Sequence, residues 1–150
     1  LAEKYSKLNT KIIGLRYFNI FGKGQTIEYA GVITKFLDRI NERKSPIIFG
    51  NGSKIRDFIH VSDVARANLM AMNSNSSNLI VNVGTGNATS ILELANMMIN
   101  ASGLKMDPIF VEALEGDIEK SVADISQVKK YLNWEPKIEL QYGLKEILKK

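Results

Sequence analysis

Two glycine-rich stretches of this sequence have the composition of loops that bind phosphate groups. Gly84-Thr85-Gly86 follows an apolar stretch and precedes a helical one, as in a dinucleotide-binding loop, but Thr89 stands where the third glycine would be. Gly22-Lys23-Gly24 has neither the spacing of a P-loop nor its Lys-Ser or Lys-Thr ending. Glycine also lets a chain turn at the end of a strand. We therefore interpret both stretches as tight turns and not as nucleotide sites.

Side chains that could catalyse a reaction or bind a metal are few. His60 is the single histidine, and the alternating pattern around it does not distinguish a core position from a surface position or a site. Glu115 and Asp117 form a carboxylate pair without an evident partner for acid–base chemistry. The absence of cysteine excludes disulfides and thiolate metal sites. The sequence thus predicts no catalytic residue and no metal site.

Composition and charge are those of an ordinary globular protein. The 150 residues are 45% hydrophobic and 24% charged, enough for one compact domain with a core. Twenty basic and sixteen acidic residues are interleaved, so the net charge of +4 does not indicate a nucleic-acid-binding stripe. No apolar run approaches the ~18 residues of a membrane span, and no signal peptide is visible. We expect a cytoplasmic protein that binds neither nucleic acid nor membrane.

Strand-like and helix-like segments alternate along the chain. β-branched and aromatic residues indicate strands at 12–21, 47–49, 56–61, 79–83 and 108–111. Apolar residues three and four positions apart indicate helices that follow residues 32, 62, 90, 124 and 139. Ser90 and Glu93 have the spacing of a capping box. Alternation of this kind predicts an α/β fold.

The helix after residues 56–61 allows a more detailed prediction. Ser62 or Asp63 can cap its N-terminus. Ala65, Leu69 and Met72 recur at helical spacing, so we expect this face of the helix to point into the core.

Five segments, in order and over nearly the whole chain, resemble the extended short-chain dehydrogenases that act on nucleotide sugars. They are LRYFNIFGKGQ at 15–25, YAGVITKF at 29–36, IIFGNGSKIRDFIHVSDVARANLMAM at 47–72, NVGTG at 82–86 and EGDIEKSVADISQVKKYLNWEPKIELQYGLKEI at 115–147. The Tyr-Phe-Asn triplet at 17–19 is similar to the UDP-glucose 4-epimerase branch and unlike the triplet usual in dTDP-glucose 4,6-dehydratases. By this resemblance the chain is identified as a member of the NAD-dependent nucleotide-sugar epimerase/dehydratase family.

The resemblance implies a fold, a cofactor and a reaction. The fold would be the C-terminal part of a Rossmann-like parallel sheet plus the small α/β domain that binds the sugar nucleotide. In the family, a Rossmann domain holds NAD, and a tyrosine with a lysine four residues later removes the proton of the sugar 4-hydroxyl. Hydride passes to the nicotinamide, and an epimerase returns it to the other face of the rotated 4-keto sugar. The cofactor carries the chemistry and the protein orients it.

Two parts of the family's machinery are absent from residues 1–150. There is no N-terminal G-x-x-G-x-x-G loop, and none of the five tyrosines is followed by a lysine four residues later. The Ala2-Glu3 pair resembles the helix just after the family's catalytic lysine. We therefore expect the C-terminal, substrate-binding portion of an epimerase, inactive alone and unable to hold NAD by itself. Its expected partners are a UDP-sugar or related nucleotide sugar, the N-terminal half and further copies in a homo-oligomer.

The resemblance also implies roles for individual residues. Asn19 matches the asparagine that hydrogen-bonds the phosphates of the nucleotide sugar, and Arg56 matches the arginine that clamps the diphosphate, a task suited to a guanidinium fork. Asp117 matches an acid near the nucleotide ribose. Tyr17 and Phe18 match residues that line the nicotinamide pocket. Because these two alternate along a strand, we expect one of them to belong to the core.

Position 114 departs from the family, which often has an arginine three residues before the aspartate. Leu114 offers no donor, so a second diphosphate contact is lost and Arg56 would bind the phosphates with backbone amides alone. We expect Leu114 to face the diphosphate. The competing interpretation is that Leu114 packs in the core and the loop simply differs.

Two of these residues also allow roles that involve no ligand. Arg56 could pair with Asp57 or Glu42 on the surface, and Asn19 could hydrogen-bond its own loop. The chain as a whole could also be a fragment of a nucleotide-sugar 4,6-dehydratase, or a non-catalytic module that binds nucleotide sugars.

Overall fold

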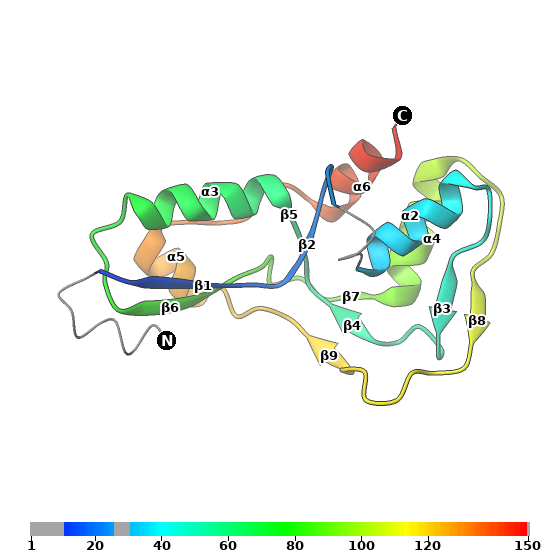
Figure 1. Ribbon diagram of the computed structural model, residues 1–150, viewed down its shortest axis with the longest axis horizontal. Helices are drawn as coiled ribbons and strands as arrows, with labels where there is room; N and C mark the ends of the chain where they lie inside the picture. Colours follow the sequence, from blue (N-terminus) through cyan, green and yellow to red (C-terminus); the bar gives the residue numbers. More distant parts are fainter. Residues whose placement is uncertain (1–10, 26–30, 150) are drawn as a thin grey trace.

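The computed structural model describes residues 11–25 and 31–149, which form two groups of elements joined by a central crossing of the chain (Figure 1). The strands are β1 (Ile13–Tyr17), β2 (Asn19–Phe21), β3 (Ile47–Phe49), β4 (Ile55–Arg56), β5 (Phe58–His60), β6 (Leu79–Val83), β7 (Thr89–Ser90), β8 (Ile109–Val111) and β9 (Lys120–Ser121). The helices are α2 (Val32–Asn41), α3 (Val61–Met72), α4 (Ile91–Ser102), α5 (Ser126–Leu132) and α6 (Leu140–Leu148). The predicted α/β class is confirmed. The Ala2-Glu3 pair lies outside the described residues.

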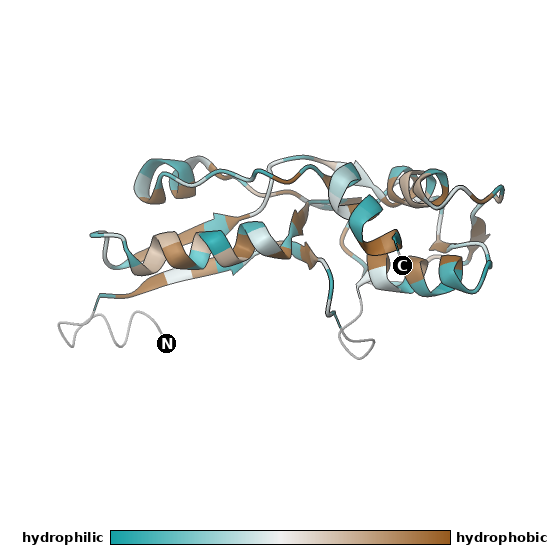
Figure 2. Cartoon of the chain, turned by 90° about the horizontal axis from the view of Figure 1, so that it is seen from above, coloured by the Kyte–Doolittle hydropathy of each residue, from teal (hydrophilic) through white to brown (hydrophobic). Residues whose placement is uncertain are grey.

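A parallel pair of strands, β1 and β6, supports the group on the left of Figure 1. Leu15 lies opposite Val81, and both belong to the core that these strands share with α3 and α5. Figure 2 shows the apolar character of the strands on this side as brown ribbon. Successive side chains of a strand alternate between its faces, so Ile80 points away from this core and is 45% exposed. The two helices therefore cover one face of the pair.

At Phe18 the chain changes the strand with which it pairs. β1 lies beside β6, whereas β2 lies beside β5 in parallel, with Asn19 opposite Phe58. The single strand expected over residues 12–21 is thus wrong in detail, since it is two strands that belong to two sheets. In open α/β sheets, ligands bind beyond the carboxyl ends of parallel strands where neighbouring strands diverge. Asn19 begins β2 at such a place.

Three helices and several short strands make up the second group, on the right of Figure 1. Its core lies between α2, α4 and α6, where Phe36, Leu94 and Leu144 are almost completely buried. β3 pairs with β8 in parallel, and β4 lies between β7 and β9. The turn at 50–52 therefore connects strands of different sheets. β4 is the central strand of the largest of these short sheets.

The start of α3 differs from the prediction. Its N-cap is His60, whose Nδ1 atom accepts a hydrogen bond from the Ser62 N–H at 3.3 Å. The buried Asp63 has another task, because its carboxylate accepts from the backbone N–H groups at 137–138, at 2.9 Å each. The Trp134 Nε1–H donates to the Asp63 carbonyl at 3.1 Å. Asp63 thus fastens α3 to the segment that leads into α6.

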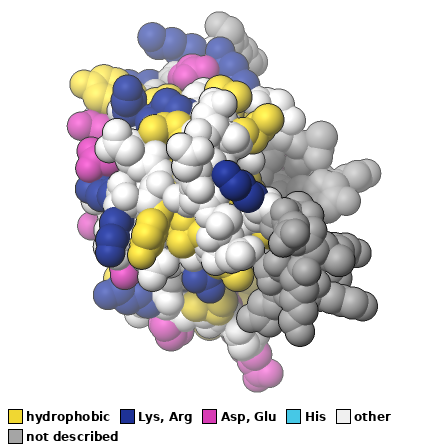
Figure 3. Space-filling view, turned by 90° about the vertical axis from the view of Figure 1, so that its left-hand side faces the viewer, with side chains coloured by type: hydrophobic (Ala, Val, Ile, Leu, Met, Phe, Trp, Pro, Cys, Tyr) yellow, Lys and Arg dark blue, Asp and Glu magenta, His cyan; other side chains and the backbone are white. Residues whose placement is uncertain are grey.

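The prediction for the buried face of α3 is also wrong. Leu69 is 59% exposed and Met72 is 80% exposed, and Ala65 is exposed as well. Val64 and Ala67 are buried instead, because the face of α3 that packs on the core shared with β1 and β6 is the one that carries them. Figure 3, which looks onto the left-hand end of the molecule, shows hydrophobic side chains among lysines and arginines on the described surface.

One of two predictions for helix starts holds as made, and the other is displaced by one residue, because the N-cap of α5 is Ile125 and not Asp124. The capping box of α4 is confirmed, since Ser90 Oγ accepts from the Glu93 N–H and the Glu93 carboxylate accepts from the Ser90 N–H. Asp124 Oδ1 accepts from the Ser126 N–H at 2.9 Å at the start of α5. In residues 11–25 and 31–149, each helix is too short or too polar to cross a membrane.

Candidate anion-binding site

A cavity of about 240 Å³ lies between α2, β3, β4 and the loop that precedes β9. Three predicted substrate residues, Asn19, Arg56 and Asp117, line it together. Leu114 also lines the cavity and is 54% exposed, so the alternative that it packs in the core is wrong. The other lining residues are Val32, Lys35, Phe36, Ile47, Phe49, Lys54 and Ile91. The cavity thus combines apolar walls with several charged groups.

Two cations share one carboxylate at this cavity. Arg56 Nη2 donates to Asp117 Oδ1 at 2.6 Å, and Lys54 Nζ donates to Asp117 Oδ2 at 2.9 Å. Lys54 and Arg56 are two positions apart in an extended stretch, so their side chains lie on the same side of it. Gly116, with φ of 74°, makes the turn that brings Asp117 to them. The alternative pairing of Arg56 with Asp57 or Glu42 is not what the described residues show.

Positive charge exceeds negative charge among the residues that line the cavity. Lys35, Lys54 and Arg56 stand against Asp117 alone. The hydrogen bond from Lys54, followed by the charge of Arg56, lowers the pKa of the Asp117 carboxyl, while its partial burial opposes this effect. The side chains of Lys54 and Arg56 are only 12% and 14% exposed. This excess of positive charge, with two of its three cations sheltered from water, suits an anion with more than one negative charge.

Asn19 is held at the edge of this cavity by the strand next to it. Its Nδ2 atom donates to the Asp57 carbonyl at 2.9 Å, and its backbone N–H donates to the same oxygen at 3.0 Å. The side chain therefore bonds a neighbouring strand segment and not its own loop. An amide nitrogen carries two hydrogens, so one donor is left for a ligand.

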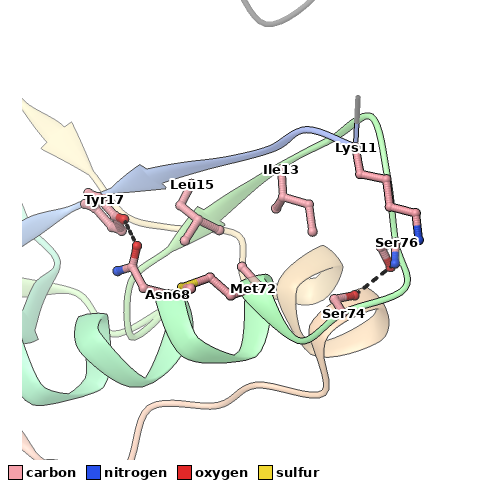
Figure 4. Close-up of a pocket in the computed structure, with 9 residues that line it drawn as sticks. Lys11, Ile13, Leu15, Tyr17, Asn68, Met72, Ser74 and Ser76 are labelled. Atoms are coloured by element: carbon pink, nitrogen blue, oxygen red, sulfur yellow. Dashed lines mark hydrogen bonds between the residues drawn. The ribbon is translucent and has the colours of Figure 1, made fainter. Parts of the chain in front are cut away.

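Tyr17 lies in a different place from these three residues. Figure 4 shows it in a groove between β1 and α3, where its hydroxyl donates to Asn68 Oδ1 at 2.9 Å. Ile13 and Leu15 line the same groove. Tyr17 is 42% exposed and Phe18 is half-buried between β1 and β2, so the expectation that one of them belongs to the core is wrong. The structure does not bring the two predicted cofactor residues together with the substrate residues.

The turn at Gly84-Thr85-Gly86 binds an anion that belongs to the chain itself. The buried Asp57 carboxylate accepts from the N–H groups of Thr85 and Gly86 at 2.9 Å each, and from the Ala123 N–H at 3.1 Å. A Cβ atom at Gly84 would lie 2.6 Å from Asp57 Oδ2. The interpretation of this stretch as a tight turn is confirmed.

His60 is buried and serves as a helix cap. Its Nε2 atom lies 3.6 Å from Glu146 Oε2, and its ring packs edge-on against Phe21 at 5.3 Å between centroids. Among the described residues, no group of three or more histidine, cysteine, aspartate or glutamate residues could hold a metal ion. The sequence pattern leaves the place of His60 open, and the structure assigns it to the core.

Lys35 and Lys54 are members of the site that were not predicted. A signal for Lys54 was present, because a Lys-x-Arg spacing in a strand places both cations on one side. No comparable signal identified Lys35, which lies on α2 and reaches the cavity only through packing of the helix beside β3 and β4.

In α/β folds that bind nucleotides, the ligand lies where neighbouring parallel strands diverge, and Asn19 of the cavity occupies such a place in this chain. The sequence profile of the NAD dependent epimerase/dehydratase family matches residues 1–84, and the chain belongs to this family. A Methanocaldococcus jannaschii protein named "Putative UDP-glucose 4-epimerase" is 40% identical over 99% of the chain and 50% of its own length. The chain spans about half the length of the relatives that it matches.

Solved structures of this family have the same fold. UDP-glucose 4-epimerase of Thermotoga maritima, solved with UDP-glucose, is 35% identical with a TM-score of 0.91. The match covers 96% of this chain and 47% of that enzyme. UDP-N-acetylglucosamine 4-epimerase of Methanobrevibacter ruminantium, solved with UDP-N-acetylmuramic acid, is 31% identical with a TM-score of 0.91. That match covers 98% of this chain and 48% of that enzyme.

Proposed function

We propose that residues 1–150 are the nucleotide-sugar-binding portion of an NAD-dependent 4-epimerase whose ligand is a UDP-sugar. The observation that carries this proposal is the convergence of Asn19, Arg56 and Asp117 on one cationic cavity. The family resemblance assigned these three residues to a single ligand, although they are far apart in the sequence. The relatives solved with UDP-sugars support the choice of nucleotide.

Each group in the cavity has a task in this proposal. The Arg56 guanidinium binds the diphosphate, because its planar fork matches two phosphate oxygens. The second hydrogen of Asn19 Nδ2 donates to a phosphate oxygen, and Asp117 accepts from a ribose hydroxyl. The cavity volume of about 240 Å³ is below the ~300 Å³ at which sites for drug-sized ligands begin. It therefore holds the charged middle of the ligand, and the sugar extends beyond it.

We propose that the described residues do not hold the dinucleotide cofactor of the family by themselves. The backbone N–H groups at 85–86 already bind Asp57, and the Tyr17 hydroxyl already donates to Asn68. The chain also has no Tyr-x-x-x-Lys pair. We propose that NAD and the base that removes the 4-hydroxyl proton belong to the sequence that relatives carry outside the matched half.

Calorimetry with the 150-residue chain tests the proposed ligand. We expect saturable binding of UDP and UDP-glucose, and no binding of NAD at the same concentration. Uridine serves as the control for contacts that do not involve phosphate. The proposal would be contradicted if the chain did not bind UDP-glucose, or if it bound NAD as tightly as UDP-glucose.

An activity assay separates the binding role from catalysis. With NAD and UDP-galactose, the isolated chain should give no turnover above a heat-inactivated sample, because it has no candidate base for the 4-hydroxyl. Turnover would show that catalytic groups are present in these residues. A 4,6-dehydratase fragment or a non-catalytic binding module would share the binding result, so the product formed by the complete enzyme decides between them.

A further inference from the structure

Lys54 is a largely buried cation whose positive charge is only partly neutralised by its neighbours. Its side chain is 12% exposed, and among the described residues its ammonium pairs only with Asp117, at 2.9 Å. The same carboxylate also pairs with Arg56 at 2.6 Å. One negative charge is therefore divided between two cations, and a partly buried charge is costly when it is incompletely neutralised.

Position 114, where the family often has an arginine, carries no cation in this chain. Leu114 lines the same cavity and has an apolar side chain that is 54% exposed. Lys54 reaches the cavity from the strand side and is held there by Asp117. Lys35 also lines the cavity, but it is exposed on α2 and has no ion-pair partner in the described part of the chain, so it is not fixed in place.

We propose that Lys54 is the second diphosphate-binding cation of this site and replaces the arginine that the family often has at the position of Leu114. This inference rests on the proposed function and adds the residue that selects a diphosphate over a monophosphate. Arg56 and Lys54 meet the two oxygens of Asp117 in the free chain, so both cations can act on one bound anion. Two positive charges attract the two charged groups of a diphosphate more strongly than the one group of a monophosphate. Lysine binds phosphate as a point charge without the directional fork of arginine.

The test measures binding of UDP, UMP and uridine to the full 150-residue chain by calorimetry. Lys54→Gln should weaken UDP binding about tenfold, the scale of one charge-assisted hydrogen bond. Binding of UMP should weaken less, and uridine binding should not change. The matched control is Lys44→Gln, because Lys44 is exposed, pairs with Glu42 and lies outside the cavity. Thermal melts of each variant check that the fold is intact.

A rescue experiment separates phosphate binding from a merely structural role. If Lys54 substitutes for an arginine at position 114, Leu114→Arg should restore UDP binding to the Lys54→Gln chain. The conservative Lys54→Arg variant keeps the charge and should bind UDP like the original chain, even if the Gln variant fails to fold. Restoration by Leu114→Arg, together with a normal Lys54→Arg, supports the inference.

Two results overturn it in distinguishable ways. In the first, the original chain, Lys44→Gln and Lys54→Gln all bind UDP and UMP with equal affinity. The proposed role of Lys54 is then wrong, and the proposed function stands. If the original chain does not bind UDP at all, the proposed function fails and this inference fails with it.

Discussion

Asp117 Oδ1 lies 2.6 Å from Arg56 Nη2, so two residues that are 61 positions apart form an ion pair in the free chain. The family resemblance assigned one of them to the diphosphate and the other to the ribose of the same ligand. The structure adds that they also bind each other. A phosphate group that approaches Arg56 must therefore compete with Asp117 for the guanidinium.

This competition leads to a prediction for Asp117→Asn. Loss of the carboxylate frees Lys54 and Arg56, so inorganic pyrophosphate should bind more tightly to the variant than to the original chain. UDP should gain less than pyrophosphate, because the proposed acceptor for the ribose hydroxyl is also weakened. Calorimetry with both ligands measures the difference. Asp107→Asn is the control, since Asp107 is exposed and outside the cavity, and an unchanged pyrophosphate affinity in Asp117→Asn would contradict the prediction.

Arg56→Gln should weaken UDP-glucose binding by about 1.5–3 kcal/mol, the usual contribution of a hydrogen bond to a charged group. The Arg56 side chain is only 14% exposed, so water cannot easily take its place. Arg16→Gln is the matched control, because Arg16 is exposed on β1 and does not line the cavity. Equal affinities of the two variants for UDP-glucose would show that Arg56 has no part in binding the diphosphate.

The lowered pKa of Asp117 predicts a dependence on pH. The carboxylate should stay ionised as the pH falls through ~3.9, the usual pKa of aspartate, and its ion pairs should be lost only below that value. Its contribution to stability is thus present above the pKa of the unfolded chain and lost as the pH falls through the folded pKa. NMR titration of the carboxyl carbon measures this, and Lys54→Gln should move the pKa of Asp117 upward while Lys44→Gln should not.

Leu114→Arg should leave the melting temperature of the ligand-free chain nearly unchanged. Leu114 is 54% exposed, and exposed substitutions usually change stability by less than about 0.5 kcal/mol. In contrast, Leu94→Arg would bury a charge in the core of the second group and cost several kcal/mol. UDP should raise the melting temperature of Leu114→Arg more than that of the original chain. A large drop in its ligand-free melt would mean that position 114 supports the fold.

Asp57→Ala should destabilise the fold by about 3–5 kcal/mol, the scale for breaking a buried charged network. Its carboxylate is fully buried and accepts from three backbone N–H groups and the Thr85 hydroxyl, all of which would lose their acceptor. Urea denaturation gives the free energy of unfolding. Asp107→Ala at the exposed position is the control, and equal unfolding midpoints for the two variants would refute the structural role of Asp57.

Local patterns predicted those parts of the fold that depend on local interactions. The strand at 79–83 and the Ser90–Glu93 capping box are as expected, because hydrophobic content and cap chemistry act over a few residues. The break at Phe18 could not be predicted, since it depends on two distant strands that pair with either side of it. The buried face of α3 could not be predicted for a related reason. The helix has apolar residues on two faces, and only its packing against the sheet determines which face is buried.

For the site, sequence reasoning found residues through resemblance and missed those that only packing reveals. Asn19, Arg56 and Asp117 came from matched segments, and they line one cavity. Lys35 lies on a different element, and only the packing of α2 brings it to them. Residue types and spacing along the chain do not predict which face of a helix lines a cavity, because that depends on tertiary packing.

Asp57 has a consequence for competition among anions in solution. Its carboxylate fills a turn of backbone amides of the kind that binds phosphate elsewhere, and it is tethered to the chain. A tethered group has a high effective concentration that dilution cannot lower, so free phosphate competes poorly for that turn. The neighbouring Arg56 pairs with a carboxylate on an exposed loop, which can exchange. Asp57 and Arg56 are adjacent in the sequence, so a turn that is closed to free anions lies beside a guanidinium whose carboxylate partner can be displaced.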